Sequence, residues 1–400
     1  MNPRNKGLDL YRIIACGFVI INHCNSKVLL QVTPKSLAWF VALGVIFITK
    51  ICVPGFLMIT GYNLLHRSEE LQTYVNRIKR ILIVLAVFSL FYYVWRCIIH
   101  TMPLPALEDA GAAGAAAAYL LGFVKVLWQG GATDAFWYLY MYLGLLIMMP
   151  VFQMVASEFF TGKRKVSTGT GVKCETGPGS GTAHAGISVE CQGDKSKKRI
   201  NIVTICAVVA AILYVSVIPS VCVLFPGAAP SPDFIIPMIC TGTLYLFAGH
   251  LFYINRERIG AGCGIKAKDL WLVLVFIFGF ALNMCLSMLE YADTEGASFI
   301  SYSEINMSGM LIESVAAFAL FLKIRADGSF GRVIAAIAPA SFGIYLLADF
   351  MCSNTHMIYY YLCQYMNRLL AVFIQEVAAY ALGLIAVLLL RRIPVVRKYI

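Results

Sequence analysis

Residues 8–30 read LDLYRIIACGFVIINHCNSKVLL. The run is long enough for a transmembrane helix, which needs about 20 mostly apolar residues. It nevertheless contains Asp9, Arg12 and His23, and ionisable side chains inside a membrane span are costly, so they mark functional sites by default. The stretch also ends without a small-residue cleavage site, so we expect a retained membrane helix rather than a removable signal peptide.

The composition of the whole chain points to the same class of protein. Of 400 residues, 60% are hydrophobic and only 13% are charged, with a net charge of +11. A soluble domain carries about 25% charged residues, so a soluble fold, a disordered chain and a small disulfide scaffold are all excluded. The 13 cysteines form no CxxC pair, and neither a zinc site nor any other metal is expected. The chain is predicted to be an all-α integral membrane protein.

The apolar runs predict ten transmembrane helices in a single domain over residues 1–400. They cover 8–30, 37–65, 81–100, 134–155, 201–224, 233–254, 270–290, 305–323, 333–352 and 367–390. With both termini in the cytoplasm, most of the 32 Lys and Arg residues lie on the inner side, as the positive-inside rule requires. The basic excess is therefore attributed to membrane topology and not to binding of nucleic acid.

Two further regions are not predicted to span. Residues 101–133 include an Ala-rich stretch that could lie on the bilayer or dip into it from outside. Residues 156–200 are rich in Gly, Ser, Thr and Lys, which predicts a flexible cytoplasmic loop.

The ionisable residues of the first span share one face of the helix. Asp9 and Arg12 are three residues apart, and His23 follows Arg12 by eleven, which brings it 20° past three full turns. The helical rise of 1.5 Å per residue places His23 about 16 Å deeper in the membrane than Arg12. A histidine there either packs against a neighbouring helix as a structural group or takes part in chemistry, and helix geometry alone leaves both open.

A basic cluster, Arg77-Ile78-Lys79-Arg80, lies at the predicted cytoplasmic end of the third span. Arg77 and Arg80 share a helix face, so their guanidinium groups could clamp phosphates. Ordinary anchoring by positive charge is the alternative. Other intramembrane charges that could pair or line a polar cavity are Lys50, Glu313, Asp349 and Glu376, and Pro54-Gly55 is expected to interrupt the second span.

Five short phrases follow one another along the chain. They are Leu8-Asp9-Leu10-Tyr11-Arg12 through His23, Val53-Pro54-Gly55-Phe56-Leu57-Met58-Ile59-Thr60-Gly61-Tyr62, Arg77-Ile78-Lys79-Arg80, Phe136-Trp137-Tyr138-Leu139 and Ser341-Phe342-Gly343-Ile344-Tyr345-Leu346-Leu347. In kind and order they resemble the motifs of the membrane acyltransferase-3 family. The sequence departs from the family pattern at Ala348-Asp349, where a second histidine is common, and at Thr60, where Ser is usual.

The resemblance implies transfer of an acyl group, usually acetyl, from cytoplasmic acyl-CoA to a hydroxyl of an extracytoplasmic glycan at the plasma membrane. Arg12, Arg77 and Arg80 would then hold CoA phosphates, and Asp9 would orient Arg12. His23 would act as general base or transient acyl carrier. Tyr62, Trp137 and Tyr345 are suggested as hydrogen-bond donors only by their positions in these family motifs.

Two other classes of function remain open from the sequence. A transporter or flippase of a small solute or lipid-linked sugar could use the same intramembrane charges as a pathway, although no inverted repeat is visible. A membrane anchor without catalytic activity is the weaker alternative, because several spans carry ionisable residues.

Overall fold

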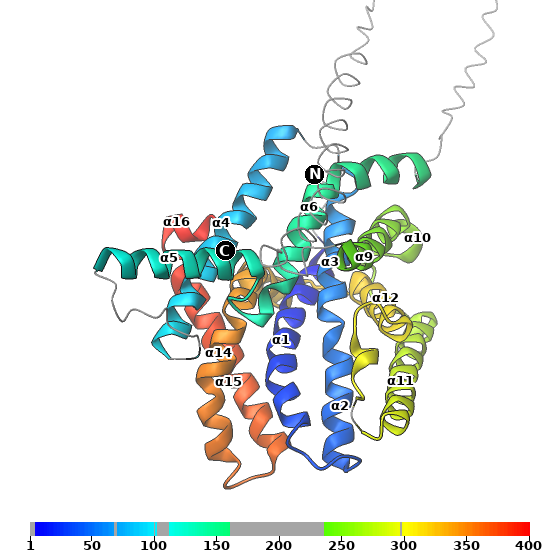
Figure 1. Ribbon diagram of the computed structural model, residues 1–400. Coiled ribbons are helices and arrows are strands. Elements are labelled where there is room, and N and C mark those ends of the chain that lie inside the picture. The colour runs from blue at the N-terminus through cyan, green and yellow to red at the C-terminus, as the bar shows by residue number, and fades with distance from the viewer. Residues whose placement is uncertain (1–4, 68–69, 100, 102–111, 161–235, 297) are drawn as a thin grey trace, which may run out of the picture.

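The computed structural model describes residues 5–67, 70–99, 101, 112–160, 236–296 and 298–400 (Figure 1). Within these ranges the chain is helical and contains no strand, which confirms the all-α prediction. Seven helical segments there are long and apolar enough to cross a membrane. They are Lys6–Leu29, Leu37–Leu64, Leu71–Ile98, Asp134–Ser157, Ala267–Asp293, Gly328–Leu362 and Arg368–Leu390.

Three predicted spans are not among these seven. Helices α9 (Ile236–Ile254) and α12 (Ser308–Lys323) occupy two of the predicted positions, but the 16 residues of α12 fall short of the usual spanning length. The predicted span 201–224 lies outside the described residues, as does the predicted loop from 161 to 200. The total of ten and the cytoplasmic placement of the termini therefore stay predictions. Helix α6 continues to Phe160, a few residues beyond the predicted end of the span at 155.

Helix α1 (Lys6–Leu29) lies at the centre of the bundle. Its first turn is capped by Asn5, whose side chain accepts a hydrogen bond from the backbone N–H of Leu8. It packs against α2 (Leu37–Lys50), α3 (Cys52–Leu64), α12, α14 (Ser341–Leu362) and α15 (Arg368–Leu390). Figure 1 shows it between the α14–α15 pair and α2. The helix that carries the ionisable stripe is therefore surrounded by protein.

The interruption predicted at Pro54-Gly55 is confirmed, and it separates α2 from α3 at Ile51. Proline has no N–H to donate, and its ring clashes with the carbonyl four residues earlier, so the helix breaks one turn before it. The Ile51 carbonyl accepts a hydrogen bond from the Tyr11 hydroxyl at 3.1 Å. A Cβ at Gly55 would lie 2.5 Å from the Tyr11 ring, so this contact requires glycine.

The ninth predicted span is longer than expected and is bent. It comprises α13 (Gly328–Ile337), the short 3₁₀ turn η7 (Ala338–Ala340), which contains Pro339, and α14. The chain then runs through α15 to the short helix α16 (Pro394–Arg397).

The region 101–133, predicted not to span, contains α5 (Ala112–Gln129). Figure 1 shows α5 running across the bundle rather than along it. It packs against α4 (Leu71–Ile98), and the turn η1 (Asp134–Phe136) leads from it into α6 (Trp137–Phe160). The remaining elements are α10 (Arg256–Ile259), η5 (Ala267–Asp269), α11 (Leu270–Asp293) and η6 (Ser301–Ser303).

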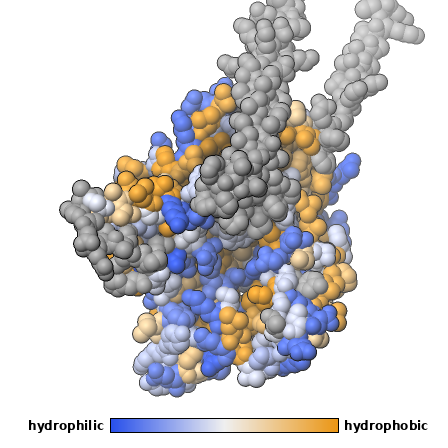
Figure 2. Space-filling view, viewed as in Figure 1, coloured by the Kyte–Doolittle hydropathy of each residue, from blue (hydrophilic) through white to orange (hydrophobic). Residues whose placement is uncertain are grey.

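The outer surface and the interior both suit a bilayer. Helix α11 exposes Phe278 at 61%, and α15 exposes Phe373 at 59%, positions that favour lipid over water. Figure 2 shows patches of hydrophobic side chains on the visible face. Inside, the Asn283 amide donates to Glu313 at 2.8 Å across the α11–α12 contact. One of the expected intramembrane charges thus has a structural partner.

Candidate active site

The predicted stripe on α1 begins with an ion pair. Asp9 is buried, and its Oδ1 lies 3.4 Å from Nη1 of the half-buried Arg12. Asp9 precedes Arg12 by three residues, so the two side chains lie on the same face of the helix and can form this pair. This places an ion-paired cation in the second turn of the central helix.

The charges of arginines on α1 and α4 act on one tyrosine of α6. The charges of Arg77, Arg12 and Arg80 all act on the Tyr142 hydroxyl, which is also hydrogen-bonded to Thr60. The stripe on α1 and the basic cluster of α4 thus act on the same hydroxyl, although 65 residues separate Arg12 from Arg77. Sequence reasoning did not single out Tyr142.

Arg77 and Arg80 differ in what they contact. The Arg77 side chain is half-buried beside Tyr142. The exposed Arg80 donates from Nε and Nη2 to the Tyr399 carbonyl, at 3.2 and 2.9 Å. The guanidinium of Arg80 therefore also attaches the C-terminal segment to α4, and the pair is not a symmetric clamp.

Aromatic rings continue from this cluster into the bundle. The Tyr142 ring stacks on Tyr138 with centroids 5.8 Å apart, and Tyr138 meets Tyr345 of α14 edge-on at 5.7 Å. Tyr345, one of the three hydrogen-bond donors suggested by the family motifs, therefore lies in this row of aromatic rings. Its hydroxyl donates to the Ala135 carbonyl.

Tyr62 lies elsewhere. Its ring packs edge-on against Tyr253, with centroids 5.4 Å apart, and the charge of Arg256 acts on its hydroxyl. The structure places it beside α9 and α10, apart from the Tyr138–Tyr345 contact. Trp137, at the start of α6, is half-buried.

His23 is half-buried at the other end of the stripe. Two carboxylates act on its ring, Asp349 of α14 and the exposed Asp134 of η1. The cations that act on it are Lys27 and Lys50. The two carboxylates would stabilise an imidazolium formed when the ring accepts a proton, whereas burial and the two lysines oppose it and favour the neutral ring that a general base requires.

Asp349 is itself held by a buried hydroxyl. Thr133 Oγ1 donates to Asp349 Oδ2 at 2.7 Å, and the same oxygen caps η1 by accepting from the Ala135 N–H. Sequence reasoning named Asp349 only as one of several intramembrane charges, and it missed Thr133 and Asp134. Their signal was a Thr-Asp pair directly before an apolar helix, the usual N-cap pattern.

The site therefore has two ends along α1. Arg12 and the Tyr142 cluster form one end, and His23 with Asp349 forms the other, about 16 Å away by the rise of the helix. No group of three or more His, Cys, Asp or Glu residues that could hold a metal occurs in the part of the chain that the structure describes.

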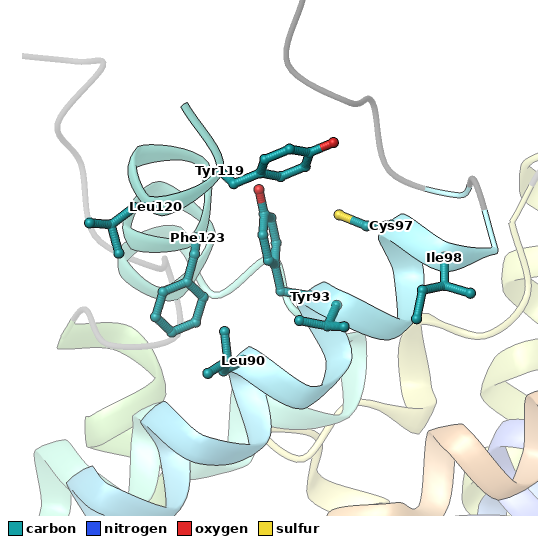
Figure 3. A pocket seen from close by; sticks show the side chains of 8 residues that line it. Leu90, Tyr93, Cys97, Ile98, Tyr119, Leu120 and Phe123 are labelled. Atoms are coloured by element: carbon teal, nitrogen blue, oxygen red, sulfur yellow. The ribbon is translucent and has the colours of Figure 1, made fainter. Parts of the chain in front are cut away.

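An apolar groove between α4 and α5 lies outside this arrangement. It has a volume of about 590 Å³, and Leu90, Tyr93 and Phe123 are among its lining residues (Figure 3). None of the residues that line it belongs to the arginine cluster or to the His23 end. The groove is not the candidate site.

Comparison with known families identifies the family of the chain. The family model described as an acyltransferase domain, acyltransferase family 3, matches residues 5–392. The chain belongs to the acyltransferase-3 family. Among curated proteins and solved structures, none gives a significant match. The match covers both ends of the site, so the chain is a membrane acyltransferase in which the two ends described above lie within the family's domain.

Proposed function

We propose that the protein transfers an acyl group, acetyl in the first instance, from cytoplasmic acyl-CoA to a hydroxyl of an extracytoplasmic glycan or similar acceptor. The plasma membrane would be its location. Family membership supports the acyltransferase activity, and the arrangement of charges along α1 supports the choice of donor and the direction of transfer.

The arginine cluster would bind the phosphates of the donor. Arg12, already oriented by Asp9, and Arg77 come from different helices and act on the same point at Tyr142. Guanidinium groups suit this task because their planar forks match phosphate oxygens. A donor held there could extend its pantetheine arm along α1 toward His23.

His23 would remove the proton of the acceptor hydroxyl as that oxygen attacks the thioester carbonyl carbon. The new C–O bond forms, the C–S bond breaks, and the proton passes from the imidazolium to the departing CoA thiolate. Asp349 would act as a positioning residue, since it lies beside the ring and is fixed by Thr133. In the alternative route, His23 carries the acyl group transiently before the acceptor takes it.

The observation that carries this proposal is the ion-paired Arg12 on the same helix as His23, together with the charges of Arg77 and Arg80 of α4, which act on the same Tyr142 hydroxyl as Arg12 does. The test is transfer of labelled acetyl from acetyl-CoA by purified protein in nanodiscs, with mass spectrometry of surface glycans from cells with and without the gene. We expect labelled product and loss of O-acyl groups in the deletion strain. Unchanged glycans together with no turnover of acetyl-CoA would overturn the proposal.

A further inference from the structure

A cavity lined mainly by cationic side chains lies at the C-terminal end of α15 and opens to the surface. Its volume is about 680 Å³, and it is lined by Arg391, Arg392, Pro394, Arg397 and Lys398. Four of these five residues are cations and none is an acid. Like charges gathered around one cavity repel each other, so the arrangement favours a polyanionic occupant.

The walls of this cavity are attached to the rest of the fold. Pro394 begins α16, where its fixed φ suits the first position of a helix. Nη1 of Arg391 donates to the Pro339 carbonyl in η7 at 2.6 Å. On the other side, Arg80 holds the carbonyl of Tyr399, the residue that follows Lys398. If these cations only fixed the membrane topology of the chain, neither the cavity nor the hydrogen bonds of Arg391 and Arg80 would be required.

Arg80 also connects the cavity to the candidate active site. Its guanidinium binds the segment that follows α16, while its charge acts on Tyr142 together with Arg12 and Arg77. Cationic side chains therefore continue from the C-terminal cavity to the arginine cluster. A ligand with phosphates at several positions could contact both.

We propose that the C-terminal cavity binds phosphate groups, and specifically those on the adenosine end of acyl-CoA. This inference rests on the proposed function. Acyl-CoA carries a 3′-phosphate on its ribose as well as a diphosphate, more anionic charge than Arg12 and Arg77 alone can pair. The C-terminal cations hold the 3′-phosphate, and the arginine cluster holds the diphosphate.

The test compares CoA with dephospho-CoA, which differs only by the 3′-phosphate. Binding of each to the full-length protein in nanodiscs is measured for wild type and for the variant Arg392→Gln, Arg397→Gln, Lys398→Gln, which leaves the Arg391 and Arg80 bonds in place. We expect wild type to bind CoA at least about tenfold more tightly, as one lost charge-assisted contact implies. The variant should bind both ligands with equal affinity.

A matched control carries the same change of charge elsewhere. Arg258→Gln, Lys268→Gln and Arg332→Gln alter three exposed cations that lie outside the cavity lining. The control should keep the preference for CoA. An equal loss in the control, or a cavity variant that keeps the preference, would overturn the inference.

Anionic phospholipid headgroups also carry phosphate and could occupy the same cavity. A second measurement distinguishes them from acyl-CoA. Native mass spectrometry would follow retention of phosphatidylglycerol by the same variants. Loss of the lipid by the cavity variant with an unchanged CoA preference would assign the cavity to lipid and overturn the nucleotide assignment. Wild-type protein that binds neither CoA nor dephospho-CoA would instead reject the proposed function itself.

Discussion

Replacing Arg77 by Gln tests whether the arginine cluster binds the donor. Arg77 is half-buried beside Tyr142, whereas Arg80 already donates two hydrogen bonds to the Tyr399 carbonyl. A charge-assisted contact to phosphate is worth about 1.5–3 kcal/mol. Since each 1.4 kcal/mol is a factor of ten, we expect the acetyl-CoA dissociation constant to rise about 10- to 150-fold in Arg77→Gln.

The measurement is calorimetric titration of acetyl-CoA into purified protein in nanodiscs. Arg67→Gln is the control, because Arg67 is an exposed cation on the same predicted side of the membrane. Arg80→Gln should weaken binding less than Arg77→Gln and should also lower Tm, since it frees the C-terminal segment. An Arg77→Gln variant that folds and binds acetyl-CoA within threefold of wild type would refute the assignment and leave the residue as a topology anchor.

Three further predictions concern the His23 end, the helix break and the topology. Thr133→Val and Asp349→Asn should each lower kcat about 10- to 100-fold with the KM for acyl-CoA unchanged, by analogy with the hydrogen-bond partners that orient histidines in metal sites. Steady-state kinetics showing a change in KM alone would argue against this role. Gly55→Ala should lower stability by about 1–3 kcal/mol because its Cβ would overlap Tyr11, while Gly131→Ala, which meets nothing within 4 Å, should leave Tm unchanged. Reporter fusions should read cytoplasmic after residues 70, 180, 262 and 328 and outside after 115 and 296, and a surface signal at 180 would reverse the topology.

Much of the fold could be predicted from sequence because membrane helices are specified locally. Each needs a long apolar run, and lipid leaves few alternatives to a helix. The break at Ile51 was equally local, because a proline inside a helix removes one donor and adds a clash. The bend at Pro339 and the length of α6 were missed, since apolar periodicity does not define where a helix ends.

The site could be predicted only where its residues share one helix. Asp9, Arg12 and His23 lie on α1, so helical spacing alone placed them on one stripe. The charges of Arg12 and Arg77 both act on Tyr142 because of how α1, α4 and α6 are arranged, which no local pattern encodes. The same holds for Thr133 and Asp349, which are 216 residues apart in sequence.

The most direct test of the central claim is acyl transfer by His23→Gln. Glutamine keeps the size and hydrogen bonding of the side chain but takes up no proton. We predict that purified His23→Gln protein binds acetyl-CoA as wild type does yet transfers acetyl at least about 100-fold more slowly, the lower bound for losing a general base. Near-normal transfer by a well-folded His23→Gln variant would contradict the account and make His23 a structural residue.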